Sequence, residues 1–193
     1  MANIAIFGGT FNPFHIGHYQ ILSYLCSLDF VDKVLVMPDN IPPHKVCDYL
    51  ASDTDRINMC SLIIKDFKKA ELCLIEFERQ EKSYTVDTLK LLKKKYPNDN
   101  FFVSIGADML ATLDKWHNWQ ELLHLTSFIV FKRVGVPDFT LHLERMKQFG
   151  AEITVSDREI EFVSSSDLRK NLDKSLLPEK IYNYIMEKGI YNG

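Results

Sequence analysis

Short apolar segments alternate with helical ones along the whole chain, and this alternation is the feature that most restricts the fold. Strands are expected at residues 3–7, 33–37, 72–77, 101–105 and 128–132, with a weaker one at 153–155. Helical stretches are expected at 19–27, 54–68, 84–96, 109–125 and 139–149, and from Ser165 to the end with a break near Pro178, a good first-turn residue. Because strands that alternate with helices build parallel sheets, the pattern predicts an α/β fold.

The strands are too apolar to leave one face of a sheet in water, which predicts a Rossmann-like, doubly wound parallel sheet with helices on both faces. Ligands of such sheets bind beyond the carboxyl ends of the strands, where the strand order reverses. Four segments follow strands and should meet there, namely Gly8–His18, the loop from Pro38 to Asp53, Gly106–Asp108 and Lys132–Arg133. No repeat or linker interrupts the 193 residues, so one domain spanning 1–193 is expected.

Charge and composition exclude several classes of protein. With 26 acidic and 23 basic residues the net charge is −3, so the chain has no overall basic field for nucleic acid or an anionic membrane, and any anion site must be local. No window approaches the length of a membrane span, which favours a cytoplasmic protein. The cysteines show no close pairing, which favours reduced core thiols over disulfides or a zinc site; they are Cys26, Cys47, Cys60 and Cys73. The oligomeric state stays open, a homodimer included.

The segment Gly8–His18 directly after the first strand has the composition of a phosphate-binding loop. Glycines let the main chain approach a ligand closely, and the helix that follows offers unpaired N–H groups to an anion. His15 and His18 are expected to start that helix. The G-x-G-x-x-G spacing of a dinucleotide-binding loop is absent. The two histidines could instead ligate a metal, but no third ligand stands at a zinc-like spacing.

In register and in position, this segment resembles the T/HxGH signature of the nucleotidylyltransferase superfamily, here His15-Ile16-Gly17-His18. Near the other end, Val163–Arg169 resembles the superfamily's I-S-S-T/S-x-I-R motif. The resemblance implies that its serines and arginine hold the phosphates of ATP. Hydroxyls and N–H groups at a helix start suit oxyanions, and an arginine adds a fork of donors. The simpler interpretation is that Ser164 caps the helix together with Asp167, and both can be true.

Three further segments resemble the bacterial nicotinate-nucleotide adenylyltransferases. They are Pro38–Lys45, similar to P-x-x-x-P-P-H-K, Ser83–Leu89, similar to S-Y-T-x-D-T-L, and Gly106–Asp108 with Leu113 and Trp116, similar to G-x-D…L-x-x-W. The closing Tyr184-Ile185 and Gly189–Tyr191 also match the family's Y-I…G-x-Y. The resemblance implies that ATP and nicotinate mononucleotide give nicotinate adenine dinucleotide and pyrophosphate, by direct in-line attack without a covalent intermediate.

The same resemblance implies the roles of individual residues. Contacts to ATP are expected from Gly8, Gly9, Thr10, Phe11, His15, His18, Gly106, Asp108, Ser165, Ser166 and Arg169, of which His15, His18 and Arg169 are the catalytic candidates. Contacts to the mononucleotide are expected from Thr10, His44, Lys45, Thr85, Trp116 and Arg133, with the ring stacked on the indole. A Mg²⁺ ion is expected on the ATP phosphates and water, with no metal site of the protein's own.

Alternatives accompany some of these assignments. Lys45 and Arg133 could be solvated surface charges. Of the two tryptophans, Trp116 is assigned to the ligand and Trp119 to packing, and His117, His124 and His142 are taken as ordinary surface or helix residues. Asn12 stands where many relatives carry Asp, so a metal role for this position is open. A related transferase acting on phosphopantetheine, or a nucleotide sensor without turnover, would share the glycine loop and the serine motif.

Overall fold

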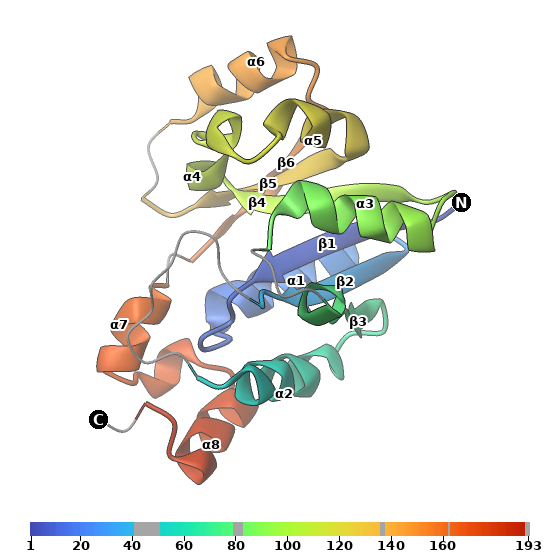
Figure 1. Cartoon of the computed structure of the whole chain (residues 1–193). Coiled ribbons are helices and arrows are strands. Elements are labelled where there is room, and N and C mark those ends of the chain that lie inside the picture. The colour runs from blue at the N-terminus through green and yellow to red at the C-terminus, as the bar shows by residue number, and fades with distance from the viewer. Residues whose placement is uncertain (41–50, 79–82, 136–137, 162, 192–193) are drawn as a thin grey trace.

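The computed structural model describes residues 1–40, 51–78, 83–135, 138–161 and 163–191, and its centre is a six-stranded parallel sheet (Figure 1). The strands lie in the order β3-β2-β1-β4-β5-β6, and every neighbouring pair is parallel. They are β1 Asn3–Gly9, β2 Lys33–Pro38, β3 Ala70–Leu72, β4 Asn100–Gly106, β5 Ser127–Arg133 and β6 Ile153–Ile160.

Helices cover both faces of this sheet, as the apolar strands predict. They are α1 Ile16–Ser27, α2 Asp53–Ile64, α3 Thr85–Lys95, α4 Ala107–Leu110, α5 Trp119–Leu125, α6 Thr140–Gln148, α7 Ser165–Lys170 and α8 Glu179–Lys188, with 3₁₀ turns at Ile75–Glu78, Leu113–Lys115 and Lys174–Leu176. One buried cluster joins the sheet to α1, α2, α7 and α8, and a second joins its other face to α3, α4, α5 and α6. The predicted doubly wound α/β architecture is therefore confirmed.

The strand order places a reversal point between β1 and β4. From β1 the chain proceeds outward through β2 and β3, and then returns to β4 and proceeds outward on the other side through β5 and β6. After the carboxyl ends of β1 and β4, the chain therefore leaves in opposite directions along the sheet. This is the place where parallel sheets of this kind bind ligands. The glycine loop follows β1, and Gly106–Asp108 lies at the end of β4 and the start of α4.

The prediction of a strand over residues 72–77 is wrong. Strand β3 spans only Ala70–Leu72, and residues 75–78 form a 3₁₀ turn instead. Pairing with β2 ends when the N–H of Cys73 donates to the carbonyl of Val36, and the chain then turns so that Ile75 and Glu76 become buried. An edge strand has only one neighbour, so the apolar pattern alone does not reveal where its pairing stops.

The last strand is longer than the expected 153–155. Strand β6 continues to Ile160, with an irregularity opposite Val130–Lys132 of β5. The second half of this strand, Ser156–Glu159, is polar, so the apolar pattern in the sequence did not extend to it. Such residues are tolerated because β6 is an edge strand. The break near Pro178 is confirmed, with Pro178 as the N-cap residue of α8.

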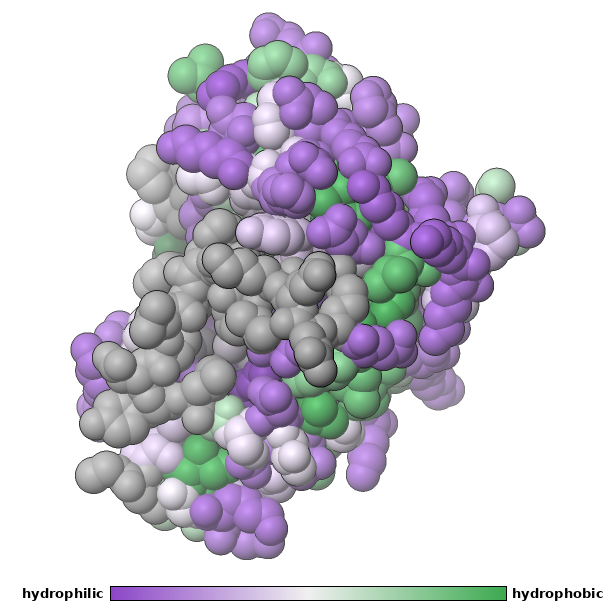
Figure 2. All heavy atoms as spheres, in the orientation of Figure 1, coloured by the Kyte–Doolittle hydropathy of each residue, from purple (hydrophilic) through white to green (hydrophobic). Residues whose placement is uncertain are grey.

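Among the coloured residues of the face shown in Figure 2, polar side chains predominate, and apolar side chains gather mainly around the β3 edge of the sheet. Within the described part of the chain, no helix combines the length and the apolar character that a membrane crossing requires.

Candidate active site

A cavity of about 320 Å³ opens at the reversal point of the sheet, where the ends of β1 and β4 diverge. Its walls come from the glycine loop, the end of β4, the start of α3, the turn before α5 and the start of α7. The lining residues are Ile6, Phe7, Gly8, Gly9, Thr10, Phe11, His18, Ile21, Met37, Asp39, Glu76, Ser83, Tyr84, Thr85, Val103, Ser104, Ile105, Gly106, Met109, Trp116, His117, Phe131 and Ser165. Segments far apart in the sequence thus meet around one space, as the strand order predicts.

His15 and His18 begin α1, as predicted, through a reciprocal hydrogen-bond pair. His15 is the N-cap residue, and its Nδ1 accepts the N–H of His18 at 3.3 Å. The Nδ1 of His18 accepts the N–H of His15, also at 3.3 Å. Since each Nδ1 acts as an acceptor, each neutral ring carries its proton on Nε2. The cap therefore fixes both imidazoles in the tautomer that offers an Nε2–H donor.

The structure places the two histidines differently with respect to the cavity. His18 lines the cavity, whereas His15 is 6% exposed, does not line it, and stacks on His18 with ring centroids 3.6 Å apart. The rings of Phe11 and Phe14 also pack against the His18 ring, with centroid distances of 5.0 and 5.3 Å. His18 is thus the histidine presented to a ligand, and His15 supports its orientation.

Gly17, between the two histidines, has no room for a side chain. A Cβ at this position would lie 3.0 Å from the carbonyl oxygen of Glu161 and 3.3 Å from the ring of His15. Only glycine lets α1 begin this close to the segment after β6 while the His15 ring lies against the helix. Gly17 is therefore part of the device that orients the histidines.

The serines of the motif at the start of α7 make different contacts. Ser164 caps the helix by accepting the N–H of Asp167 at 3.2 Å, which confirms its role as the helix cap. Ser165 lines the cavity. Ser166 is exposed, and its hydroxyl accepts a hydrogen bond from Arg169 at 3.2 Å. The motif thus provides both a helix cap and a hydroxyl at the cavity wall.

Two arginines donate hydrogen bonds to backbone carbonyl oxygens of the glycine loop. Arg169 donates to the carbonyl of Asn12 at 2.9 Å, and Arg56 of α2 donates to the carbonyl of Thr10 at 3.0 Å. Arg56 is 0% exposed, and its ion pair with Asp53 at 2.6 Å offsets part of its charge. Sequence reasoning missed Arg56, because no local pattern distinguishes an arginine under a loop from one on a helix surface.

Another part of the cavity wall is formed by Ser83, Tyr84 and Thr85, around the start of α3, and by Trp116 and His117 before α5. The rings of Tyr84 and His117 lie 4.4 Å apart. Ser83 is 8% exposed, and its hydroxyl has no hydrogen-bond partner among the described residues. A buried hydroxyl that lacks a protein partner is available to a ligand.

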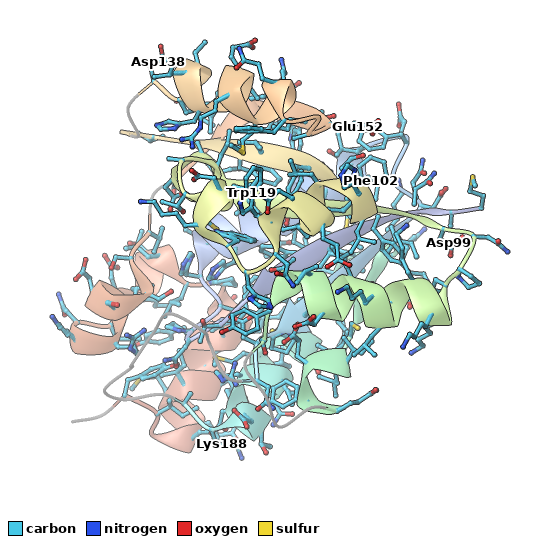
Figure 3. The ribbon with its side chains drawn as sticks, turned by 45° about the horizontal axis from the view of Figure 1, so that its top comes forward. Asp99, Phe102, Trp119, Asp138, Glu152 and Lys188 are labelled. Carbon is cyan, nitrogen blue, oxygen red and sulfur yellow. The ribbon has the colours of Figure 1, made fainter. Side chains whose placement is uncertain are left out.

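Two of these lining residues were not anticipated. His117 was taken as an ordinary surface residue, and although it is exposed it also lines the cavity, so that prediction was incomplete. Ser83 was known only as the first residue of a motif. The tryptophans behave as assigned with respect to the cavity. Trp116 lines it, while Trp119 packs edge-on against Phe149 at 5.1 Å on the α6 side of the molecule (Figure 3).

Two carboxylates also line the cavity without having been predicted. Asp39, just after β2, accepts a hydrogen bond from the hydroxyl of Thr10 at 3.4 Å. Glu76 is 3% exposed and accepts a hydrogen bond from the hydroxyl of Thr88. The sequence could have indicated them only through their positions, since Asp39 follows β2 and Glu76 lies in the turn after β3. Both segments lie at the edge of the sheet where ligands bind.

Other predicted residues do not line the cavity, Ser166 and Arg169 among them, or lie outside the described residues. Asp108 is exposed between the lining residues Gly106 and Met109 and does not itself line the cavity. His44, Lys45 and the side chain of Arg133 lie outside the described residues.

Neither a metal site nor a reactive thiol forms in the described residues. No group of three or more His, Cys, Asp or Glu side chains among them could hold a metal ion. Burial raises the pKa of the Cys26 thiol to about 11 and raises the pKa values of the Cys60 and Cys73 thiols. These cysteines are free thiols, as predicted. Their raised pKa values oppose a nucleophilic role; Cys47 lies outside the described residues.

Residues 6–171 match the cytidylyltransferase-like family. The chain is 36% identical to the nicotinate-nucleotide adenylyltransferase of Bacillus subtilis, with 99% of each chain covered. It is 40% identical to a probable nicotinate-nucleotide adenylyltransferase of Bacillus cytotoxicus, again over 99% of each. Among solved structures, a nicotinic acid mononucleotide adenylyltransferase of Plasmodium falciparum complexed with NaAD superposes with a TM-score of 0.80 at 24% identity, covering 100% of this chain and 98% of the other. That likeness demonstrates a common fold.

Proposed function

This chain belongs to the cytidylyltransferase-like family and, within it, to the nicotinate-nucleotide adenylyltransferases, and on that basis we propose that its cavity joins ATP to nicotinate mononucleotide. The reaction transfers the adenylyl group of ATP and yields nicotinate adenine dinucleotide and pyrophosphate, a step of NAD biosynthesis. The observation that carries the proposal is the convergence of the glycine loop, His18, Ser165 and Trp116 on one cavity at the reversal point of the sheet.

The chemistry requires no protein nucleophile. A phosphate oxygen of the mononucleotide attacks the α-phosphorus of ATP, and the bond from that phosphorus to the bridging oxygen of pyrophosphate breaks. Catalysis then consists of holding the two phosphates in line and stabilising the charge that develops on their oxygens. His18, whose ring carries its proton on Nε2, and Ser165, with its hydroxyl, line the cavity and are assigned to these oxygens. Arg169, which follows Ser165 in α7 and donates to the carbonyl of Asn12, is assigned to the outgoing pyrophosphate.

The pyridine ring is assigned to the far end of the cavity. Trp116 offers an indole face for a flat cationic ring, and Thr85 begins a helix of eleven residues whose first N–H groups suit a carboxylate. The buried hydroxyl of Ser83 adds a further donor. This end provides hydroxyl and N–H donors, which suit a carboxylate better than an amide that carries donors of its own.

A divalent cation, most simply Mg²⁺, would accompany ATP. Because the described residues contain no set of three metal ligands, the ion fits a position on the ATP phosphates and water instead of a site of the protein's own. There it would neutralise part of the phosphate charge. We also propose that the chain is one cytoplasmic domain. The oligomeric state, a homodimer included, stays a prediction to be measured.

The test is pyrophosphate release with ATP and Mg²⁺, comparing nicotinate mononucleotide, nicotinamide mononucleotide and phosphopantetheine as acceptors. Turnover mainly with the nicotinate form is expected. Turnover with phosphopantetheine alone would keep the superfamily and overturn the substrate. Binding of ATP without pyrophosphate release from any acceptor would point to a sensor.

A further inference from the structure

Asn12, in the glycine loop, is the meeting point of three distant parts of the chain. Its side-chain oxygen Oδ1 accepts the N–H of Ala51 at 3.1 Å and the hydroxyl of Tyr191 at 2.5 Å. Its own backbone carbonyl accepts the guanidinium of Arg169 at 2.9 Å. Asn12 is 2% exposed, so these contacts are made away from solvent.

The C-terminal segment is built to bring Tyr191 to this point. Helix α8 ends at Gly189, whose φ of 63° is left-handed and turns the chain back, with the N–H of Ile190 donating to the carbonyl of Ile185. Tyr191 also has a positive φ, 64°, a conformation that a tyrosine rarely adopts. Ile190 and Tyr191 then pack against the core cluster of α1, α2 and α8. Figure 1 shows α8 beside α2, the helix that carries Arg56.

The same hydrogen bonds explain what the side chain at position 12 does. The N–H of Ala51 and the hydroxyl of Tyr191 both donate to this one oxygen. An Asp carboxylate offers an oxygen acceptor in the same place, so these two hydrogen bonds do not distinguish an amide from a carboxylate. An oxygen that already accepts two hydrogen bonds inside the protein is poorly placed to ligate an ion on a substrate.

We propose that Asn12 and Tyr191 are positioning residues, and that the hydrogen bond from Tyr191 to Asn12 holds the loop carbonyl to which Arg169 donates and thereby sets the position of the Arg169 guanidinium. This inference rests on the proposed function, in which Arg169 holds pyrophosphate. The last turn of the chain thereby sets the position of a phosphate-binding side chain 22 residues earlier in the sequence, through a loop near the first strand.

Loss of the tyrosine hydroxyl tests the proposal directly. Tyr191→Phe keeps the ring in the core and removes the donor, and we expect it to weaken pyrophosphate binding and lower kcat by roughly 5- to 10-fold, the size of one lost hydrogen bond. The KM for nicotinate mononucleotide should stay within about twofold, because that substrate binds at the other end of the cavity. Calorimetric titration with inorganic pyrophosphate measures the affinity whether or not the protein turns over.

Tyr184→Phe is the matched control. It makes the same change in the same helix region and removes hydrogen bonds to Asp55 and Asn58 that do not involve Asn12. Thermal unfolding followed by circular dichroism verifies that both variants are folded at the assay temperature. Equal pyrophosphate affinity in Tyr191→Phe and Tyr184→Phe would overturn the inference. Absence of turnover in the wild-type protein would instead overturn the proposed function.

Substitution of Asn12 separates positioning from metal binding. Asn12→Asp keeps the acceptor oxygen, so pyrophosphate affinity and the Mg²⁺ concentration for half-maximal rate should both stay within about threefold of wild type. Asn12→Leu removes the acceptor and should lose at least as much affinity as Tyr191→Phe. If Asn12→Asp sharply lowered the Mg²⁺ requirement, the position would be a metal ligand and the inference would fail.

Discussion

The Nδ1 atoms of His15 and His18 accept each other's backbone N–H, both at 3.3 Å, so two imidazoles act as the paired caps of one helix. Helix caps are usually hydroxyl, amide or carboxylate side chains. An imidazole in this role has a second ring nitrogen, and in His18 that nitrogen belongs to a ring that lines the cavity. The proposed function therefore assigns helix capping and a phosphate contact to the same side chain.

Replacing His18 should remove a transition-state contact with little effect on the fold. His18→Ala is expected to lower kcat by a factor on the order of 10² to 10³, because a hydrogen-bond donor aimed at developing negative charge contributes about that much. Steady-state pyrophosphate release measures this change. His142→Ala in α6 is the control, since it lies outside the cavity. A rate near wild type in His18→Ala would contradict the assignment of His18 to the active site.

Replacing Trp116 should affect one substrate more than the other. Trp116→Ala removes the indole face at the pyridine end, so the KM for nicotinate mononucleotide should rise at least tenfold while that for ATP changes by less than about threefold. Trp119→Ala, which loses only the contact with Phe149 and its packing, should lower the melting temperature and leave both KM values near wild type. Equal effects of Trp116→Ala on both substrates would contradict the assignment.

Arg56 should contribute to stability through its buried contacts. Arg56→Met leaves the carbonyl of Thr10 without its donor and is expected to lower the free energy of unfolding by about 1–3 kcal/mol. Urea unfolding provides the measurement. Arg145→Met is the comparison, because it removes an exposed ion pair to Asp114 and should cost less than about 1 kcal/mol. Equal losses in the two variants would mean that the buried position has no special importance.

Cys26 should react slowly with alkylating agents near neutral pH. Burial raises its pKa from 9.0 to about 11, so the folded protein keeps the neutral thiol over the range in which an exposed thiol already ionises. Since only the thiolate reacts, alkylation of the native protein should accelerate about tenfold per pH unit up to pH 11. Mass spectrometry of the peptide containing Cys26 follows the reaction. A rate that levels off near pH 9 would show an ordinary pKa.

Much of this architecture follows from local pattern. The central strands β1, β2, β4 and β5 were located to within two residues at each end, because a strand buried on both faces is a continuous apolar run. Their parallel arrangement then places the loops at one edge, which is why His18, Ser165 and Trp116 could be assembled into a site from sequence alone. The motif resemblance supplied which of the loop residues to select.

Other features depend on tertiary contacts that no local pattern encodes. The ends of β3 and β6 are set by edge pairing, so the strand predicted over 72–77 was wrong and the one at 153–155 too short. Arg56 and Tyr191 reach the glycine loop from α2 and from beyond α8, across long stretches of sequence. A donor to a backbone carbonyl has no required partner residue type, so neither contact leaves a sequence signature.

The burial of Arg56 has a consequence for how an acidic chain can accept two anionic substrates. Its guanidinium lies beneath the loop with 0% exposure, so dissolved ions do not reach it as they reach a lysine on the surface. The part of its field that the ion pair with Asp53 leaves acts on the cavity across protein atoms of low polarisability, where attraction is stronger than in water. Recognition of phosphate by this protein should consequently depend far less on ionic strength than recognition by a basic surface patch, and stray polyanions such as nucleic acid meet a surface of net negative charge.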